Sequence, residues 1–300
     1  MAEKKQLADV VICDLCDSNR FSPMFNVGTW HLVCCTDCGL VFTSPRYTAD
    51  AIAAIYTNEY YQRTPAYYHS QMSPPSTDDL KLASVARRAL GYTRPQRSLD
   101  LGCGSGRLVE AFRLLGFEAR GIEPNEMAVQ AGRQCGRNVA LMALAEIPER
   151  SQHCITAMHV LEHTYSPKGF LVQCHRILSD RGLLILEVPN FASSASRRLK
   201  EHWQPLYPDT HLYQFAPGTL TSYLTVSGFE VLSIRKIGGG GFVHAAGEPA
   251  GDPADNDSVS DRGRRIKDWI WNNRHCVYRI PYAQDIVRYF FWQSSRSETP

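Results

Sequence analysis

From about residue 97 onward, the hydrophobic and polar positions of the chain follow two alternating periods. Short apolar runs typical of buried strands alternate with segments in which apolar residues recur every three or four positions. Strands are expected at 97–101, 117–123, 154–158, 182–190 and 229–237, and helices at 106–116, 125–134, 166–178 and 217–228. Asn125 and Ser166 fit the N-cap position of two of these helices. The alternation predicts an α/β fold, with a Rossmann-like, doubly wound and mostly parallel sheet.

The remaining segments differ from this core in composition. Residues 1–46 combine cysteines and turn residues with short β-type runs, which predicts a small zinc-binding ribbon. Residues 47–96 are expected to form a tyrosine-rich connector or lid with a helix near its end. The α/β core occupies 97–237, and 238–300 combine a flexible segment rich in Gly, Pro and Asp with a basic, aromatic tail. The default expectation is that this tail packs on the core; the alternatives are a homodimer contact, and contact with a membrane surface or a phosphate-bearing substrate.

The composition limits the class of protein. Hydrophobic residues make up 44% of the 300 residues, charged residues make up 21%, and the formal net charge is +2. These values are ordinary for a globular protein and predict no chain-wide attraction to nucleic acid or to anionic membranes. No signal peptide and no apolar run long enough to span a membrane is visible. A cytoplasmic protein without a transmembrane segment is therefore expected.

A glycine-rich loop, LDLGCGSG at residues 99–106, links the first core strand to its helix. In open α/β sheets this loop lies beside a nucleotide-like ligand. The dinucleotide fingerprint needs a third glycine at position 107, which is arginine here. Asp100 would repel a pyrophosphate and attract a cation such as a sulfonium, and Glu123 stands where an acidic side chain takes ribose hydroxyls. Either carboxylate alone is equally typical of a solvated strand end, but together they favour a nucleoside ligand that carries a positive charge.

Five of the ten cysteines lie in one short N-terminal stretch. Cys13-x2-Cys16 and Cys35-x2-Cys38 have the spacing of a two-knuckle zinc site, in which four thiolates complete a tetrahedron. Four protein ligands leave no open position, so a structural Zn²⁺ is expected. Cys34 is an alternative to Cys35, although the compact knuckle favours Cys35. Small buried side chains are expected at the isolated cysteines Cys103, Cys135, Cys154, Cys174 and Cys276.

The motifs LDLGCGSG, GIEPN, HVLEH and DRGLLILEVPN, in this order within about 98–237, resemble those of class I S-adenosylmethionine-dependent methyltransferases. The resemblance implies that S-adenosylmethionine is the cofactor and that Glu123 holds its ribose. Glu146 stands near the position where the family often has an aspartate for the adenine amino group. The cofactor-binding residues are expected to be Asp100, Gly102, Cys103, Gly104, Gly106, Glu123, Glu146 and His159.

The cysteine pattern, followed by a tyrosine-rich stretch and this core, also resembles a bacterial family of methyltransferases with an N-terminal zinc-binding region. Many members act in the biosynthesis of sugars, polysaccharides or secondary metabolites. The resemblance implies that the acceptor is a small molecule or a glycan, such as a sugar or nucleotide sugar. The sugar C-methyltransferases that share this plan are longer, with a further C-terminal domain. O-methylation is therefore favoured over C-methylation.

Methyl transfer to a hydroxyl needs a base that removes the acceptor's proton. His163, after the fourth core strand, is the first candidate because histidine titrates near neutral pH. The alternative is that Glu162 and His163 only pack at the start of a helix. The family resemblance places an H-x-Y-x-F segment, with His211 and Tyr213, over the substrate pocket. The alternative for these two is a core aromatic cluster.

Asn190 and a tyrosine pair are further candidates for the substrate pocket. Asn190, at the end of a core strand, is expected to face the pocket. Tyr60 and Tyr61 are candidates for a lid over the site, although tyrosine pairs are more often packing residues.

Three other functions stay open at this stage. An RNA methyltransferase would use the ribbon to grip RNA, but acidic residues outnumber basic ones in residues 1–60. A nicotinamide-dependent oxidoreductase is disfavoured by Asp100 and by Arg107 in the loop. A non-catalytic partner would bind the cofactor without turning over a substrate.

Overall fold

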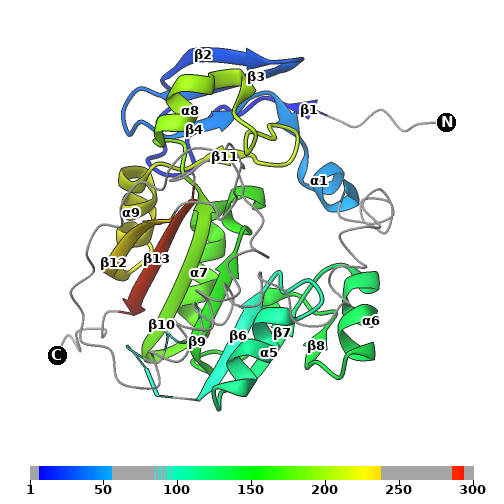
Figure 1. The fold of residues 1–300 in the computed structure, drawn as a ribbon. Coiled ribbons are helices and arrows are strands. Elements are labelled where there is room, and N and C mark those ends of the chain that lie inside the picture. The colour runs from blue at the N-terminus through cyan, green and yellow to red at the C-terminus, as the bar shows by residue number, and fades with distance from the viewer. Residues whose placement is uncertain are drawn as a thin grey trace, which may run out of the picture.

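The structure, a computed structural model, describes residues 7–55, 97–237 and 286–293, together with single residues between 85 and 96. These residues form a central seven-stranded sheet, a four-stranded sheet and a two-stranded ladder (Figure 1). The lid candidates Tyr60 and Tyr61 lie outside the described residues.

The central sheet has the strand order β12-β13-β10-β9-β6-β7-β8. Its strands are β6 (Arg97–Leu101), β7 (Glu118–Ile122), β8 (Val139–Ala140), β9 (Gln152–Met158), β10 (Leu178–Pro189), β12 (Phe229–Ile237) and β13 (Ile286–Gln293). The five strands from β6 to β10 pair in parallel. The strand order reverses between β6 and β9, which is the topological switch point where open α/β sheets bind ligands. The predicted Rossmann-like, doubly wound fold is confirmed.

Helices cover the two faces of this sheet because its buried side chains alternate between two hydrophobic clusters. The helices are α1 (Ala49–Ile55), α5 (Arg107–Leu114), α6 (Glu126–Gln134), α7 (Pro167–Ile177), α8 (Ser194–Leu199) and α9 (Pro217–Val226), with short 3-10 turns η1 (Leu144–Glu146), η2 (Leu161–His163) and η3 (Lys200–His202). On β10, Leu184 and Leu186 pack in the cluster that contains α7 and α9, whereas Leu183 and Ile185 pack in the cluster that contains α5. This period of two is the physical basis of the doubly wound arrangement.

Two of the predicted helix caps are confirmed. The Asn125 side chain accepts a hydrogen bond from the backbone N–H of Ala128, at 3.0 Å, and begins α6. The Ser166 hydroxyl accepts from the backbone N–H of Gly169, also at 3.0 Å, and begins α7. Each cap satisfies a first-turn N–H that has no partner inside its own helix.

The C-terminal segment contributes a strand that the sequence pattern did not identify. β13 lies antiparallel between β10 and β12, from the Pro189↔Ile286 pair to the Leu183↔Trp292 pair on the β10 side. The sequence pattern predicted that the core ends at residue 237 and that this region belongs to an aromatic tail. This strand is recognised only from its pairing, because a long stretch of sequence separates β13 from β12. The other tail residues lie outside the described part of the chain.

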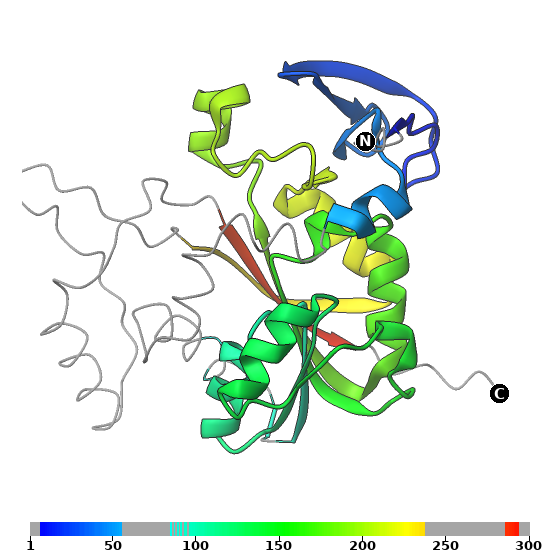
Figure 2. The same ribbon diagram turned by 90° about the vertical axis from the view of Figure 1, so that its right-hand side faces the viewer.

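The cysteine-rich segment builds the second sheet, of order β11-β4-β3-β2. Its strands are β2 (Phe21–Val27), β3 (Trp30–Cys35), β4 (Val41–Thr43) and β11 (Tyr213–Gln214), while β1 (Leu7–Ala8) pairs with β5 (Arg46–Tyr47). β11 comes from the α/β core and pairs antiparallel with β4. The N-terminal sheet therefore continues into the core and lies above the carboxyl ends of β9 and β10 (Figures 1 and 2).

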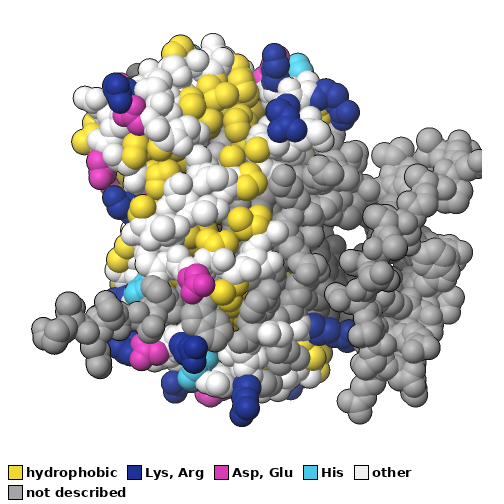
Figure 3. Space-filling model, turned by 90° about the vertical axis from the view of Figure 1, so that its left-hand side faces the viewer, with side chains coloured by type: hydrophobic (Ala, Val, Ile, Leu, Met, Phe, Trp, Pro, Cys, Tyr) yellow, Lys and Arg dark blue, Asp and Glu magenta, His cyan; other side chains and the backbone are white. Residues whose placement is uncertain are grey.

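The described surface shows no continuous charged face in the view of Figure 3. There the Lys and Arg side chains lie in separate small groups, and hydrophobic side chains form a band that begins near the top. No helix among the described residues is long and apolar enough to cross a membrane.

The isolated cysteines differ in burial. Cys154 and Cys174 are buried as expected, and Cys103 is half-buried. The expectation was wrong for Cys135, which is exposed because it lies at the C-terminal end of α6. Cys276 lies outside the described residues.

Candidate functional site

The glycine loop between β6 and α5 has two glycines that packing requires and one that faces open space. Gly102, Gly104 and Gly106 all have positive φ, at 64°, 53° and 77°. A Cβ at Gly102 would lie 2.7 Å from Val160, and one at Gly106 would lie 2.5 Å from Val139. A Cβ at Gly104 would meet nothing within 4 Å. The backbone at Gly104 is therefore open to a ligand that approaches closely.

Glu123 holds this loop in place. Its side chain is 4% exposed and follows directly after β7. One carboxylate oxygen accepts from the backbone N–H of Gly104 at 2.9 Å, and the other accepts from the backbone N–H of Asn125 at 3.0 Å. A carboxylate has about four acceptor positions in all, so one such group can accept from several donors at once. The structure brings together the two features that the sequence pattern assigned to a nucleoside site.

Asp100 lies on β6 beside this loop and is also buried. The Thr156 hydroxyl donates to its carboxylate at 2.6 Å. Burial raises the pKa of Asp100 to about 7, with a further contribution from the negative charge of Glu123. A cation bound nearby would favour the ionised form of this carboxylate and lower its pKa.

Cys103 fills the space beside β7. A Cβ at Gly121 would lie 2.4 Å from its sulfur, so the two residues are in close contact. Burial raises the pKa of the Cys103 thiol. The side chain therefore packs as a neutral thiol beneath the loop.

Asp100 is expected to make the free energy of unfolding fall as the pH rises. Its carboxyl has a pKa of about 7 in the folded chain and about 3.9 in an unfolded chain. Between these values the folded state holds a proton that the unfolded state releases, so the contribution of Asp100 to stability is greatest below about pH 4 and is lost toward about pH 7. From about pH 4 to about pH 7, the change in the free energy of unfolding measured in urea should therefore be more negative for the wild type than for Asp100→Asn. Equal slopes for the two proteins would contradict the assignment.

A second group of polar residues lies where β9 ends. His159 has a positive φ of 56°. Its two ring nitrogens each lie 3.3 Å from a buried carboxylate, Nδ1 from Glu162 and Nε2 from Glu187. Burial alone would lower the pKa of His159, but hydrogen bonds to the two carboxylates raise it to about 9. His159 is therefore a cation that neutralises part of this buried negative charge.

Glu187 is the residue of this group that the sequence analysis missed. It is 1% exposed and lies on β10. The available signal was a single carboxylate inside the apolar run GLLILEVPN. Buried carboxylates need a partner, so this residue type in that position pointed to a polar site at the end of the strand.

The predicted catalytic histidines His163 and His211 come together although they are far apart in the sequence. Their ring centroids are 4.5 Å apart and the rings are nearly perpendicular. The backbone N–H of Leu212 donates to the carbonyl of Glu162 at 2.8 Å, which joins the two segments. Nδ1 of His163 lies 3.1 Å from the carbonyl oxygen of Thr210. Burial lowers the pKa of both histidines, that of His211 to about 3.

Tyr213 lies in the core rather than beside this pair. It is 2% exposed, and its hydroxyl donates to the carbonyl of Tyr165 at 3.2 Å. The Arg46 guanidinium lies over both tyrosine rings. Burial raises the pKa of Tyr213 to about 12, which leaves its hydroxyl protonated. These contacts match the packing alternative.

Asn190 and Glu146 both form local contacts. Asn190 is buried, and its side-chain oxygen accepts from the backbone N–H of Ala192 at 3.1 Å. The exposed carboxylate of Glu146 accepts from the backbone N–H of Ala143 at 2.7 Å and stabilises the η1 turn. The expected adenine contact of Glu146 stays a prediction.

The four predicted zinc ligands lie together at the knuckles of the N-terminal sheet. The sulfur atoms of Cys13 and Cys38 are 3.6 Å apart, as are those of Cys16 and Cys35. All four sulfur atoms lie within 4.8 Å of one another. Zn–S bonds of about 2.3 Å in a tetrahedron place the sulfur atoms about 3.8 Å apart. The donor set and its spacing therefore fit a closed zinc site.

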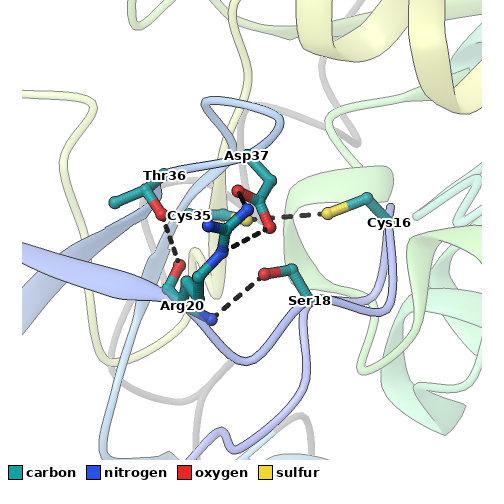
Figure 4. Close-up of polar contacts among 6 residues, drawn as sticks. All are labelled: Cys16, Ser18, Arg20, Cys35, Thr36 and Asp37. Carbon is teal, nitrogen blue, oxygen red and sulfur yellow. Dashed lines mark hydrogen bonds and ion pairs between the residues drawn. The ribbon is translucent and has the colours of Figure 1, made fainter.

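Backbone hydrogen bonds favour the ionised thiolate form of one cysteine in this cluster. Burial opposes ionisation of Cys35, but hydrogen bonds from the backbone of Cys38 and Asp37 lower its pKa to about 7. The Cys34 sulfur points instead to the backbone carbonyl of Cys35, so the structure places Cys35 in the cluster. Arg20 forms an ion pair with Asp37 and braces the second knuckle (Figure 4).

The first knuckle contacts the core directly. Asp14 lies between Cys13 and Cys16 and accepts from the Ser166 hydroxyl at 2.7 Å and from the backbone N–H of Lys168 at 2.9 Å. It therefore extends the N-cap of α7, where a carboxylate is favoured. The N-terminal end of α7 therefore contacts the cysteine cluster through Asp14. The same helix end follows closely after the η2 turn, which carries His163.

Known proteins support the fold and the family of the chain. A family model described as a methyltransferase domain matches residues 68–234, more than half of the chain. The ubiquinone biosynthesis O-methyltransferase of Alkalilimnicola ehrlichii is 30% identical over 120 residues, which cover 37% of this chain and 48% of that protein. The protein of the same name from Burkholderia vietnamiensis is 27% identical over 163 residues, which cover 47% of this chain and 68% of that one. The similarity to the first of these relatives thus spans about half of its length.

Solved structures resemble the chain at the level of the fold. The 1,6-didemethyltoxoflavin-N1-methyltransferase of Burkholderia thailandensis has a TM-score of 0.53 at 12% identity, covering 91% of this chain and all of that one, 100%. A SAM-dependent methyltransferase from Archaeoglobus fulgidus has a TM-score of 0.50 at 22% identity, covering 72% and 94%. The glycine loop, whose Gly104 N–H donates to Glu123, is consistent with the methyltransferase domain family. The family match shows that the chain belongs to the methyltransferase domain family, and the similarities to solved structures agree with it.

Proposed function

We propose that this protein transfers the methyl group of S-adenosylmethionine to a hydroxyl of a small molecule. The observation that carries the proposal is the contact between Glu123 and Gly104 at the switch point of the sheet. It supports Glu123 as an acceptor for ribose hydroxyls, beside backbone that is open to a ligand. Asp100, next to the loop, favours a cofactor with positive charge over one with a pyrophosphate.

The histidine pair supports proton removal as the second part of the chemistry. The acceptor oxygen must lose its proton, attack the methyl carbon in line with the departing sulfur and release S-adenosylhomocysteine. His163 and His211 lie at the carboxyl end of the sheet, past β9, which is the edge where the glycine loop also lies. Their low pKa values mean that both imidazoles are neutral at neutral pH and can accept a proton or bind a cation.

The nature of the acceptor is inferred from relatives. The curated relatives are named as O-methyltransferases of ubiquinone biosynthesis, which supports oxygen as the accepting atom. The N-terminal cysteine pattern resembles that of enzymes of sugar and secondary-metabolite biosynthesis. A sugar, nucleotide sugar or phenolic metabolite is therefore the acceptor class to screen first. Acidic residues outnumber basic ones in residues 1–60, which disfavours RNA as the substrate.

We also propose that Cys13, Cys16, Cys35 and Cys38 bind a structural Zn²⁺. Four thiolates close the coordination sphere, so the ion would stabilise the N-terminal sheet without taking part in the reaction. By binding the four cysteines, the ion would stabilise the first knuckle, in which Asp14 contacts the start of α7.

The proposal is tested by calorimetric titration with S-adenosylmethionine, followed by transfer of its labelled methyl group to acceptor panels. Micromolar binding together with methylation of a hydroxyl compound is the expected result. Binding without transfer to any panel would favour a non-catalytic partner. Folded, zinc-loaded protein that gives no heat with S-adenosylmethionine would refute the proposal, and titration with a nicotinamide cofactor would then follow.

A further inference from the structure

Three side chains beyond the cofactor loop form a group with the composition of a metal site. Ligand atoms of Glu162, His163 and His211 all lie within 4.8 Å of one another. The first two belong to the η2 turn after β9, and the third precedes β11. The group is distinct from the cysteine cluster, which has its own four donors.

Among the residues that the structure describes, no hydrogen-bond partner is found for two buried atoms of this group. They are Oε2 of Glu162 and Nδ1 of His211. The Glu162 residue is 1% exposed and His211 is 8% exposed. A buried carboxylate oxygen or imidazole nitrogen that lacks a partner destabilises the folded chain. One cation between them would satisfy both atoms.

The surroundings fix the ligands and supply a negative field. The carbonyl of Thr210 lies 3.1 Å from Nδ1 of His163, the type of contact that orients a metal-binding imidazole. Glu162 and Glu187 bring two negative charges, and His159 brings one positive charge. The buried carboxylate of Glu162 would attract a divalent cation.

We propose that Glu162, His163 and His211 bind a divalent transition-metal cation. Two imidazoles and one carboxylate are a common ligand set for Zn²⁺ and for Fe²⁺, and they leave positions open for substrate. Bonds of about 2.0–2.2 Å in a tetrahedron place ligand atoms about 3.4 Å apart, and the three ligand atoms here lie within 4.8 Å of one another.

The consequence for catalysis rests on the proposed function. An acceptor hydroxyl bound to the cation loses its proton to solvent more readily, because the cation stabilises the oxygen anion. The oxygen then forms a bond to the methyl carbon, the carbon–sulfur bond breaks, and its electron pair stays on the sulfur of S-adenosylhomocysteine. The histidines act in this case as ligands that hold the cation rather than as free bases.

The binding claim is tested with Mn²⁺ as a probe, because Mn²⁺ favours nitrogen and oxygen ligands over thiolates. Electron paramagnetic resonance titration of wild type that contains one zinc ion per chain, at the cysteines, is expected to show one bound Mn²⁺ per chain. Glu162→Gln and His211→Gln should each weaken this binding by about tenfold or more. His202→Gln is the matched control, since that exposed histidine lies on η3 outside the group. Binding of S-adenosylmethionine by each variant reports whether it is folded.

The outcomes separate this inference from the proposed function. Wild type that binds S-adenosylmethionine but no Mn²⁺, or variants that bind Mn²⁺ as tightly as wild type, would overturn the metal site and leave the proposed function standing. Mn²⁺ binding in protein that does not bind S-adenosylmethionine would support the metal site and refute the proposed function. If Mn²⁺ binds and methyl transfer proceeds at the same rate with and without it, in protein that contains zinc only at the cysteines, the catalytic role of the cation is refuted.

Discussion

Glu123→Ala is expected to weaken binding of S-adenosylmethionine by about 100-fold or more. Hydrogen bonds to a charged group contribute about 1.5–3 kcal/mol each, and every 1.4 kcal/mol is a factor of about ten in affinity. The variant loses the acceptor for the ribose hydroxyls. It also leaves the backbone N–H groups of Gly104 and Asn125 without their carboxylate partner. Calorimetric titration of wild type and variant measures the change.

Two further variants make this prediction specific. Glu123→Gln keeps the size and one oxygen acceptor, so an intermediate affinity is expected. Glu126→Gln changes an exposed carboxylate at the start of α6, and its affinity should equal that of wild type. Melting temperatures of all the proteins show whether the loop variants remain folded. Equal affinities for wild type and Glu123→Ala would remove Glu123 from the cofactor site.

Cys35→Ser is expected to abolish zinc binding and to unfold the N-terminal sheet. The Cys35 side chain is fully buried, and its sulfur lies 3.6 Å from that of Cys16. Apparent binding energies of structural zinc are about 10–16 kcal/mol in zinc-finger peptides, so loss of one thiolate removes a large stabilising contribution. Since β11 of the core pairs with β4, the melting temperature of the whole protein should fall as well. Metal analysis and limited proteolysis provide the measurements.

Cys34→Ser is the matched control for this prediction. Cys34 is the neighbour of Cys35 in the chain, but its sulfur points to a backbone carbonyl instead of the cluster. The variant should therefore keep one zinc ion per chain and the protease resistance of wild type. Zinc that is retained in Cys35→Ser and lost in Cys34→Ser would reverse the ligand assignment.

Some residues of the candidate site could be predicted from their spacing in the sequence, whereas the contacts of others could not. Asp100, Glu123 and the glycines lie within one strand–loop–helix–strand segment, so their spacing alone indicated a nucleoside site. Glu146 and Tyr213 were chosen by position in a motif, and in the structure each side chain forms a hydrogen bond with a backbone group. Position in a motif does not reveal which way a side chain turns, because packing against neighbours decides its rotamer.

The sequence by itself determined the features that depend on local periodicity and spacing. These are the alternation of strands and helices, the caps at Asn125 and Ser166, the glycine loop and the doubled cysteine motif. Each arises from interactions between residues close in the chain, and such interactions leave a pattern that one sequence displays.

Only the tertiary structure decided which distant segments meet. It placed β13 between β10 and β12, joined β11 to the N-terminal sheet, and brought His211 against His163 beside the buried carboxylate of Glu162. These contacts depend on chain reversals over tens of residues and on the exclusion of water from the groups that meet. Hydrophobic periodicity specifies that a face is buried without specifying its partner, so contacts of this kind are a property of the folded chain.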